Sequence, residues 1–142
     1  MSARLPFSVV TKPTGAACNL DCQYCFFLSK ELLYDAAAQT MSEQTLERYV
    51  EAFLESSPDG EVTMLWQGGE PTLRGLYFFE RLMDLCARYR RPTQSVRHAL
   101  QTNGTLVTDE WARFFADHGF LVGVSIDGPA PLHDAYRLNR GG

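Results

Sequence analysis

The regular alternation of short apolar runs with helix-like segments constrains the fold more than any other feature of this chain. Four runs rich in strand-forming residues cover Leu5–Val10, Val62–Trp66, Val96–Gln101 and Phe120–Ile126. A helix-like segment separates each run from the next, and the first interval also holds a cysteine-rich loop. Consecutive strand–helix–strand units normally join parallel strands through right-handed crossovers. The sequence therefore predicts an α/β fold with about four parallel strands.

Local signals mark the ends of the three helices. Ser42 has the side chain of an N-cap and is followed by apolar residues at helical spacing, so the first helix is expected to begin there. The second helix is expected from about Gly75 to Tyr89. The third is expected to start at Thr108 and to close at Gly119, a residue suited to the left-handed C′ position.

The loop after the first apolar run, CNLDCQYC, contains Cys18, Cys22 and Cys25 at the spacing C-x3-C-x2-C. Three thiolates are one fewer than a structural zinc ion or an ordinary cubane cluster takes from protein. A [4Fe–4S] cluster held by three cysteines has one iron open to an exogenous ligand. The loop therefore favours a cluster of this kind.

Two other uses of the cysteines are less well supported. Zinc would need a fourth ligand, and Cys86, His98, His118 and His133 all lie far along the chain. A disulfide framework is disfavoured because four cysteines in 142 residues is a low density and no secretory signal opens the sequence. Cys86 falls in the middle of the second expected helix, where we expect it to be a small buried apolar residue.

Composition narrows the classes of partner. The chain has 142 residues, 45% of them hydrophobic, and a net charge of −4, which allows a core of ordinary size. No run of Lys and Arg favours a nucleic acid or an anionic membrane surface. No apolar stretch approaches the roughly 20 residues that cross a bilayer. Because iron–sulfur thiolates are labile in oxidising compartments, we expect a cytoplasmic location.

The segment after the second apolar run reads QGGEPTL. Gly68 and Gly69 remove side chains at a point where a ligand or another backbone approaches closely. Glu70 offers a carboxylate that could accept hydrogen bonds from an ammonium group, and Gln67 stands at the expected strand end. Taken alone, the segment is equally consistent with a simple strand-to-helix turn.

Two further strand ends carry polar side chains. Gln101 begins the QTNG segment, and Ser125 begins SIDGP. Arg137, further on, could bind a carboxylate as a two-pronged donor, although an isolated arginine is more often a solvated surface residue. The carboxyl ends of parallel strands share one edge of the sheet, so we expect these residues to meet the cysteine loop there.

In combination these motifs resemble the radical S-adenosylmethionine (SAM) superfamily. The resemblance rests on the cysteine loop with an aromatic residue, Tyr24, before its last cysteine, and on the Gly-Gly-Glu motif. The longer strings CNLDCQYCFFL, LQTNGTL and FLVGVSIDGP resemble anaerobic sulfatase-maturating enzymes, from Leu5 to Arg140. That family has a partial (β/α)6 barrel followed by a cysteine-rich SPASM domain.

The resemblance implies the cofactors and the chemistry. The open iron of the cluster would bind SAM, with the Gly-Gly-Glu motif at the SAM amino group and Ser125 beside SAM. Tyr24, Gln67, Gln101 and Arg137 complete the expected cofactor-binding set. In the family, electron transfer into SAM yields a 5′-deoxyadenosyl radical that oxidises a cysteine or serine of a sulfatase to formylglycine. The implied partners are a sulfatase polypeptide and an electron donor such as flavodoxin or ferredoxin.

Four expected strands are fewer than the family's six. We therefore expect residues 1–142 to be the N-terminal part of a radical SAM core, with further strands and the SPASM domain absent. Such a chain would lack catalytic residues for the substrate half of the site and would be inactive on substrate alone. It would also expose its fourth strand as an unpaired edge. A related enzyme that modifies a ribosomal peptide, and a non-catalytic iron–sulfur or zinc-binding module, remain as alternatives.

Overall fold

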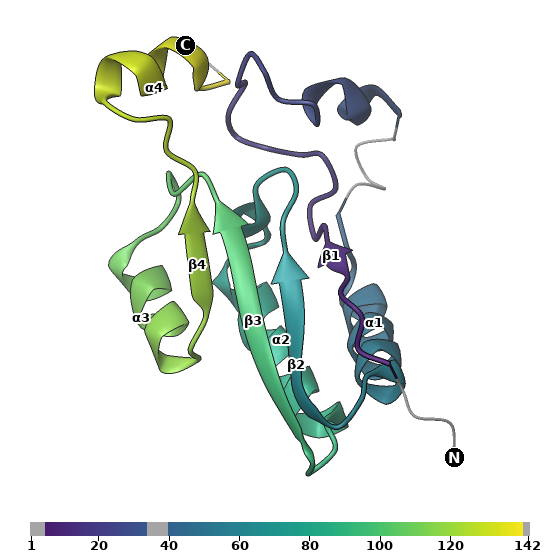
Figure 1. Ribbon diagram of the computed structural model, residues 1–142. Helices are drawn as coiled ribbons and strands as arrows, with labels where there is room; N and C mark the ends of the chain where they lie inside the picture. Colours follow the sequence, from purple (N-terminus) through teal and green to yellow (C-terminus); the bar gives the residue numbers. More distant parts are fainter. Residues whose placement is uncertain (1–4, 34–39, 141–142) are drawn as a thin grey trace.

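In the computed structural model, which describes residues 5–33 and 40–140, four parallel strands form one sheet. The strands are β1 (Val10–Thr11), β2 (Gly60–Trp66), β3 (Gln94–Thr102) and β4 (Leu121–Val124). Their order in the sheet is β1-β2-β3-β4, and every pairing is parallel (Figure 1). The predicted α/β fold with about four parallel strands is confirmed.

Helices connect the strands as the sequence predicts. The main helices are α1 (Glu43–Ser56), α2 (Leu76–Tyr89) and α3 (Asp109–Asp117). Three short helical segments were not predicted: η1 (Leu28–Leu33) after the cysteine loop, η3 (Pro71–Arg74) after β2 and α4 (Ala130–Tyr136) after β4.

The predicted helix ends are confirmed by their capping contacts. The hydroxyl of Ser42 accepts a hydrogen bond from the Thr45 N–H at 3.1 Å, and the hydroxyl of Thr108 caps α3 in the same way. Gly119 follows α3 with φ +64°, the left-handed conformation expected for its C′ position.

The first strand is much shorter than predicted. We expected it over Leu5–Val10, whereas β1 holds only Val10 and Thr11. Pro6 has no N–H to donate, and β1 pairs with only the last two residues of β2, Leu65 and Trp66. The fourth strand also ends earlier than predicted, at Val124, although the Ser125 N–H still donates to the Thr102 carbonyl.

The core lies between the sheet and the three main helices. Alternate residues of β2 point into it, and Trp66 at its centre is fully buried. The indole ring makes edge contacts with Tyr49, Phe78 and Phe79 from two helices. Cys86 is 3% exposed, and its sulfur lies 3.8 Å from that of Met64, as expected for a small apolar core residue. This packing fixes the sheet on which the site is built.

The opposite face of the sheet is open. Val10, Leu65, Ala99 and Leu121 form one row across all four strands in register. Leu121 on the edge strand is 74% exposed, and a hollow of about 320 Å³ lies over this face. β4 therefore forms a free edge of the described sheet, as predicted.

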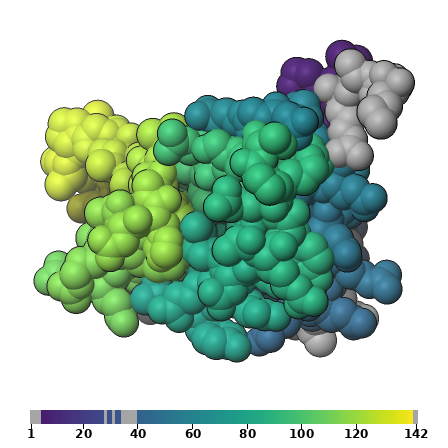
Figure 2. Space-filling model, turned by 90° about the horizontal axis from the view of Figure 1, so that it is seen from below, coloured from purple at the N-terminus to yellow at the C-terminus, as the bar shows by residue number. Residues whose placement is uncertain are grey.

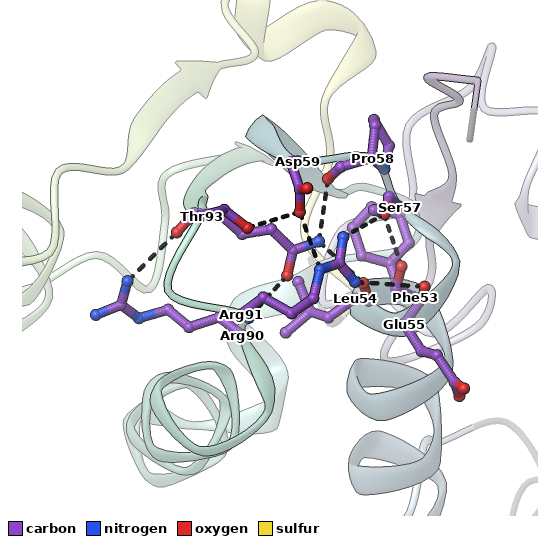
Figure 3. A network of polar contacts seen from close by, with 10 residues as sticks. Phe53, Leu54, Glu55, Ser57, Pro58, Asp59, Arg90, Arg91 and Thr93 are labelled. Carbon is purple, nitrogen blue, oxygen red and sulfur yellow. Dashed lines mark hydrogen bonds and ion pairs between the residues drawn. The ribbon is translucent and has the colours of Figure 1, made fainter. Parts of the chain in front are cut away.

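A polar network closes the end of the molecule away from the site (Figure 3). Arg91 donates to the carbonyls of Leu54 and Ser57 at 2.9 and 2.8 Å and pairs with Asp59 at 3.0 Å. The amide of Gln94 donates to the Leu54 carbonyl as well. These donors satisfy carbonyls that the end of α1 leaves without helical partners.

The elements are arranged across the molecule in their sequence order. Seen from below, the teal and green atoms of α2 and β3 fill the centre (Figure 2). The blue atoms of the α1 region lie on one side, and the lighter green and yellow atoms of the later segments lie on the other. At the far end, the strands point toward the cysteine loop and α4 (Figure 1). The carboxyl edge of the sheet is therefore where the candidate site must be sought.

Candidate functional site

A cavity of about 140 Å³ at the carboxyl edge of the sheet brings the predicted residues together. All three loop cysteines line it, with the strand-end residues Gln67, Gly68, Gly69, Glu70, Gln101, Ser125 and Arg137. Ten of the eleven predicted site residues therefore share one cavity. The eleventh, Tyr24, is 55% exposed and contacts the site through Asp127.

The cysteine loop is folded by its own backbone. The Cys25 N–H donates to the Cys22 carbonyl at 2.9 Å, and the Leu20 N–H points at the Cys18 sulfur at 3.4 Å. Burial raises the pKa of the Cys18 and Cys22 thiols, and the Leu20 N–H partly opposes this at Cys18. Bound iron would lower the pKa of these thiols and so favour their thiolate forms, against the effect of burial.

The donor set of the cysteine loop is one that an iron–sulfur cluster takes, because three cysteine thiols line one cavity. Among the described residues, no group of three His, Cys, Asp or Glu side chains could hold one metal ion. The ligands of a four-iron cluster are spread further apart than those of one ion. The thiols that line this cavity come from one short loop, as cluster ligands commonly do.

Gly69 allows the strand-end turn to touch the cysteine loop. Its φ is +52°, and a Cβ built on it would lie 2.1 Å from the Ala17 carbonyl oxygen. The next residue, Glu70, donates its N–H to the same carbonyl at 2.8 Å. The predicted reason for glycine here, close approach of another backbone, is therefore the observed one.

The carboxylate of Glu70 is buried and accepts four hydrogen bonds from protein donors. The residue is 1% exposed. Its Oε1 accepts from the N–H and hydroxyl of Thr72 and from the hydroxyl of Thr102, at 3.0, 2.6 and 2.7 Å. Its Oε2 accepts from the Asn103 N–H at 2.7 Å. The carboxylate thus ties the end of β2 to the end of β3, and its predicted contact with an ammonium group stays a prediction.

Gln101 and Ser125 contact each other across the open face of the sheet. The Gln101 amide donates to the Ser125 hydroxyl at 2.8 Å. Gly123 is paired with Gln101 in the sheet register, and a Cβ there would lie 2.3 Å from the Gln101 amide oxygen. Glycine at this position leaves room for the amide to lie over β4.

Arg137 is held by Asp127 in a two-pronged ion pair. Its Nε and Nη2 lie 2.9 Å from the two carboxylate oxygens. The Tyr24 hydroxyl donates to the same carboxylate, and its ring lies 5.6 Å from the Arg137 guanidinium. The Arg137 ion pair and the Tyr24 hydrogen bond lower the pKa of the Asp127 carboxyl. The three side chains form one charged group at the edge of the cavity.

The segment after α4 also pairs with the cysteine loop. The Asp21 and Gln23 N–H groups donate to the carbonyls of Leu138 and Tyr136 at 2.7 and 3.0 Å. Residues separated by more than 100 positions thus support one loop, and the sequence pattern gave no sign of this pairing.

Sequence reasoning missed two side chains of the site, Asn103 and Asp127, in their observed roles. Asn103 and Asp127 lie within the QTNG and SIDGP segments, but neither was expected among the site residues. The Nδ2 of Asn103 lies 3.7 Å from the Cys18 sulfur. The acidic residue between Ser125 and Arg137 could have been recognised as a partner for that arginine.

No helix in the described residues is long and apolar enough to cross a membrane.

A sequence model of the radical SAM superfamily matches residues 13–142. The chain is 44% identical over 138 residues to a serine-type anaerobic sulfatase-maturating enzyme from Bacteroides thetaiotaomicron, covering 96% of this chain and 33% of that protein. It is 41% identical over 136 residues to a cysteine-type enzyme of the same name from Clostridium perfringens, covering 95% of this chain and 36% of that protein.

A solved structure is similar over the same region. Native anSMEcpe with bound AdoMet superimposes with a TM-score of 0.86 at 39% identity. The match covers 96% of this chain and 37% of that one. The chain therefore spans about a third of the length of the curated relatives it matches.

Proposed function

The chain belongs to the radical SAM superfamily, and from this premise we propose that its cavity holds a [4Fe–4S] cluster beside S-adenosylmethionine. Cys18, Cys22 and Cys25 are the proposed cluster ligands. The observation that carries the proposal is that these three thiols and the strand-end residues line one cavity. When bound, the cluster supplies the electron that cleaves S-adenosylmethionine to methionine and a 5′-deoxyadenosyl radical.

The chain's own residues would bind and orient the cofactor. We assign the strand-end turn Gln67, Gly68, Gly69 and Glu70 to the side of the methionine group. Because three donors occupy Oε1 of Glu70, its Oε2, which accepts one hydrogen bond, and the glycine carbonyls are the available acceptors for an ammonium group. The Gly68 carbonyl contacts the Thr14 hydroxyl at 3.3 Å and has a second lone pair, whereas the Glu70 carbonyl contacts both the Thr14 hydroxyl and the Leu73 N–H.

Gln101, Ser125, Tyr24 and Arg137 complete the proposed cofactor-binding set. Gln101 and Ser125 present an amide and a hydroxyl on the open side of the sheet. Asp127 occupies the Nε–H and one N–H of Nη2 in Arg137, so a ligand carboxylate would be bound through Nη1 and the remaining N–H of Nη2. Tyr24 would hold this arginine from the cysteine loop.

For the longer protein, we propose oxidation of a sulfatase cysteine or serine to formylglycine. The relatives named above are sulfatase-maturating enzymes of both the serine and cysteine types. Residues 1–142 would form the N-terminal part of the radical SAM core, active on SAM and inactive on a peptide. The electron would come from a flavodoxin or ferredoxin, and the reaction would take place in the cytoplasm.

Anaerobic reconstitution with iron and sulfide tests the proposal. We expect an electron paramagnetic resonance (EPR) signal of a reduced [4Fe–4S] cluster that changes when S-adenosylmethionine is added. Cys18→Ala should abolish the signal, whereas Cys86→Ala, the matched control in the core, should retain it. A signal indifferent to S-adenosylmethionine, or zinc retained in place of iron, would contradict the proposal.

The substrate of the longer protein needs a separate assay. A peptide carrying a sulfatase Cys-x-Pro-x-Arg motif and its serine counterpart should both be tested for formylglycine by mass spectrometry. Deoxyadenosine without formylglycine would favour an enzyme that modifies a different peptide.

A further inference from the structure

The sulfur of Cys18 is surrounded differently from those of the other two loop cysteines. The Leu20 N–H lies 3.4 Å from it, and the Nδ2 of Asn103 lies 3.7 Å from it. Both distances fit hydrogen bonds to sulfur. Among hydrogen bonds within the described part of the chain, donors of this kind point at Cys18 and not at Cys22 or Cys25. One ligand of the proposed cluster therefore has a side-chain donor of its own.

The neighbours of Asn103 fix which end of its amide faces the sulfur. Its Oδ1 accepts from the Thr105 N–H at 2.9 Å and from the Thr105 hydroxyl at 2.7 Å. A backbone N–H can only donate, so the atom beside it must be the amide oxygen. The NH2 group is then directed to Cys18 and to the Oδ1 of Asn19, which it reaches at 2.8 Å.

The backbone of Asn103 is held equally firmly. Its N–H donates to the buried carboxylate of Glu70 at 2.7 Å. Rotation of the side chain away from the cysteine loop would break the contacts of its amide with Thr105 and Asn19. A donor fixed in this way is already oriented before any negative charge builds up on the sulfur.

We propose that Asn103 is a positioning residue that donates a hydrogen bond to the Cys18 thiolate and raises the reduction potential of the cluster. This rests on the proposed function, because it requires the cluster. Reduction adds one electron from an external reductant, and Asn103 keeps its proton throughout. The added charge is spread partly over the cysteine sulfurs, so a fixed N–H donor stabilises the reduced form more than the oxidised form.

The first test is a redox titration of the reconstituted chain followed by EPR, with dithionite as reductant. Asn103→Leu removes the donor without adding charge, and Asn103→Ala removes the whole side chain. We expect each to disfavour reduction by about tenfold, a fall of about 59 mV in the one-electron midpoint. Gln44→Leu is the matched control, because it makes the same kind of amide-to-leucine change at an exposed position of α1 that does not line the cavity, and it should leave the midpoint unchanged.

A second test uses the chain without any change at Asn103, so it does not depend on those variants folding. The sequence has three asparagines, Asn19, Asn103 and Asn139. When the asparagine side-chain amides are labelled with 15N, pulsed EPR of the reduced cluster should show a 15N hyperfine coupling. The coupling should be retained in Asn19→Asp and in Asn139→Asp, which remove the other two labelled nitrogens, and Asn19→Asp keeps the Oδ1 that accepts from Asn103.

The outcomes separate the two proposals. An unchanged midpoint in a fully loaded Asn103→Leu or Asn103→Ala chain overturns the inference. So does an absent 15N coupling, or one that disappears in Asn19→Asp or Asn139→Asp. In each case a cluster that responds to S-adenosylmethionine leaves the proposed function standing. If the unaltered chain binds no cluster, both fail together.

Discussion

Replacing Glu70 by glutamine tests whether its carboxylate is chiefly a structural tie. Glu70→Gln keeps the size of the side chain and exchanges one oxygen for an NH2 group. In one orientation the NH2 group takes the place of Oε2, which accepts from the Asn103 N–H at 2.7 Å. In the other it takes the place of Oε1, which accepts from the Thr72 N–H at 3.0 Å. Either way a buried backbone donor meets another donor.

The size of the effect follows from that mismatch. A buried donor left without an acceptor costs about 1–3 kcal/mol, and hydrogen bonds to a charged group are stronger than average. The residue is 1% exposed, so water does not replace the lost acceptor. We expect Glu70→Gln to lower the free energy of unfolding by about 2–3 kcal/mol. At about 4 °C per kcal/mol for a chain of this size, the Tm should fall by about 8–12 °C.

Urea unfolding of the cofactor-free chain measures this directly, followed by far-UV circular dichroism and by the fluorescence of the buried Trp66 and Trp111. Glu61→Gln is the control, because the Glu61 side chain is 63% exposed and pairs with Arg97 on the surface. The control should change stability by less than about 0.5 kcal/mol. A Glu70→Gln chain as stable as this control would refute the reasoning and return the carboxylate to a ligand-binding role alone.

The unfolding assay also tests substitutions at Gly69 and His98, and a binding titration tests one at Gly123. Gly69→Ala should lower the free energy of unfolding by at least about 3 kcal/mol, because the new Cβ would clash with the Ala17 backbone at a position that also has positive φ. Gly119→Ala has the strain of positive φ without the clash and should lower it by about 1 kcal/mol. Equal losses in the two variants would contradict the clash. Gly123→Ala should change stability little but weaken S-adenosylmethionine binding in an equilibrium titration, because the new methyl group displaces the Gln101 amide; unchanged affinity would count against it. Burial lowers the pKa of His98 to about 4, below about 6.5 when unfolded, so stability is complete above pH 6.5 and is lost as pH falls toward 4. Between pH 7 and pH 5 the free energy of unfolding of the unaltered chain should fall by about 2 kcal/mol more than that of His98→Phe. If the stability of the two chains depends on pH in the same way, this linkage is excluded.

The parallel sheet was predictable because each strand and helix carries its own local pattern. Ser42 and Thr108 cap their helices as expected, and Gly119 takes the predicted conformation. The first strand was not predictable from its apolar run. Pairing of an edge strand depends on the partner, and β2 offers Leu65 and Trp66 as the only partners for β1.

The location of the site was predictable for a topological reason. Parallel strands place their carboxyl ends at one edge, so Gln67, Gln101 and Ser125 had to meet near the cysteine loop. The partners of individual side chains were not predictable in this way. Arg137 was expected to bind a ligand carboxylate, yet Asp127 pairs with it. The acidic residue ten positions earlier was a candidate partner, but a residue pattern does not give the distance between their side chains.

Glu70 shows why residue type alone assigns roles incompletely. Its carboxylate holds the Asn103 N–H, and the Asn103 amide in turn contacts the Cys18 sulfur. The cofactor-side turn, the end of β3 and the cysteine loop are therefore joined by one chain of hydrogen bonds. Residues that share such a network are coupled, so substitutions at Glu70 and Asn103 should not be additive in their effect on stability. The double variant should lose less than the sum of the single losses, because the first substitution already breaks the connection that the second would remove.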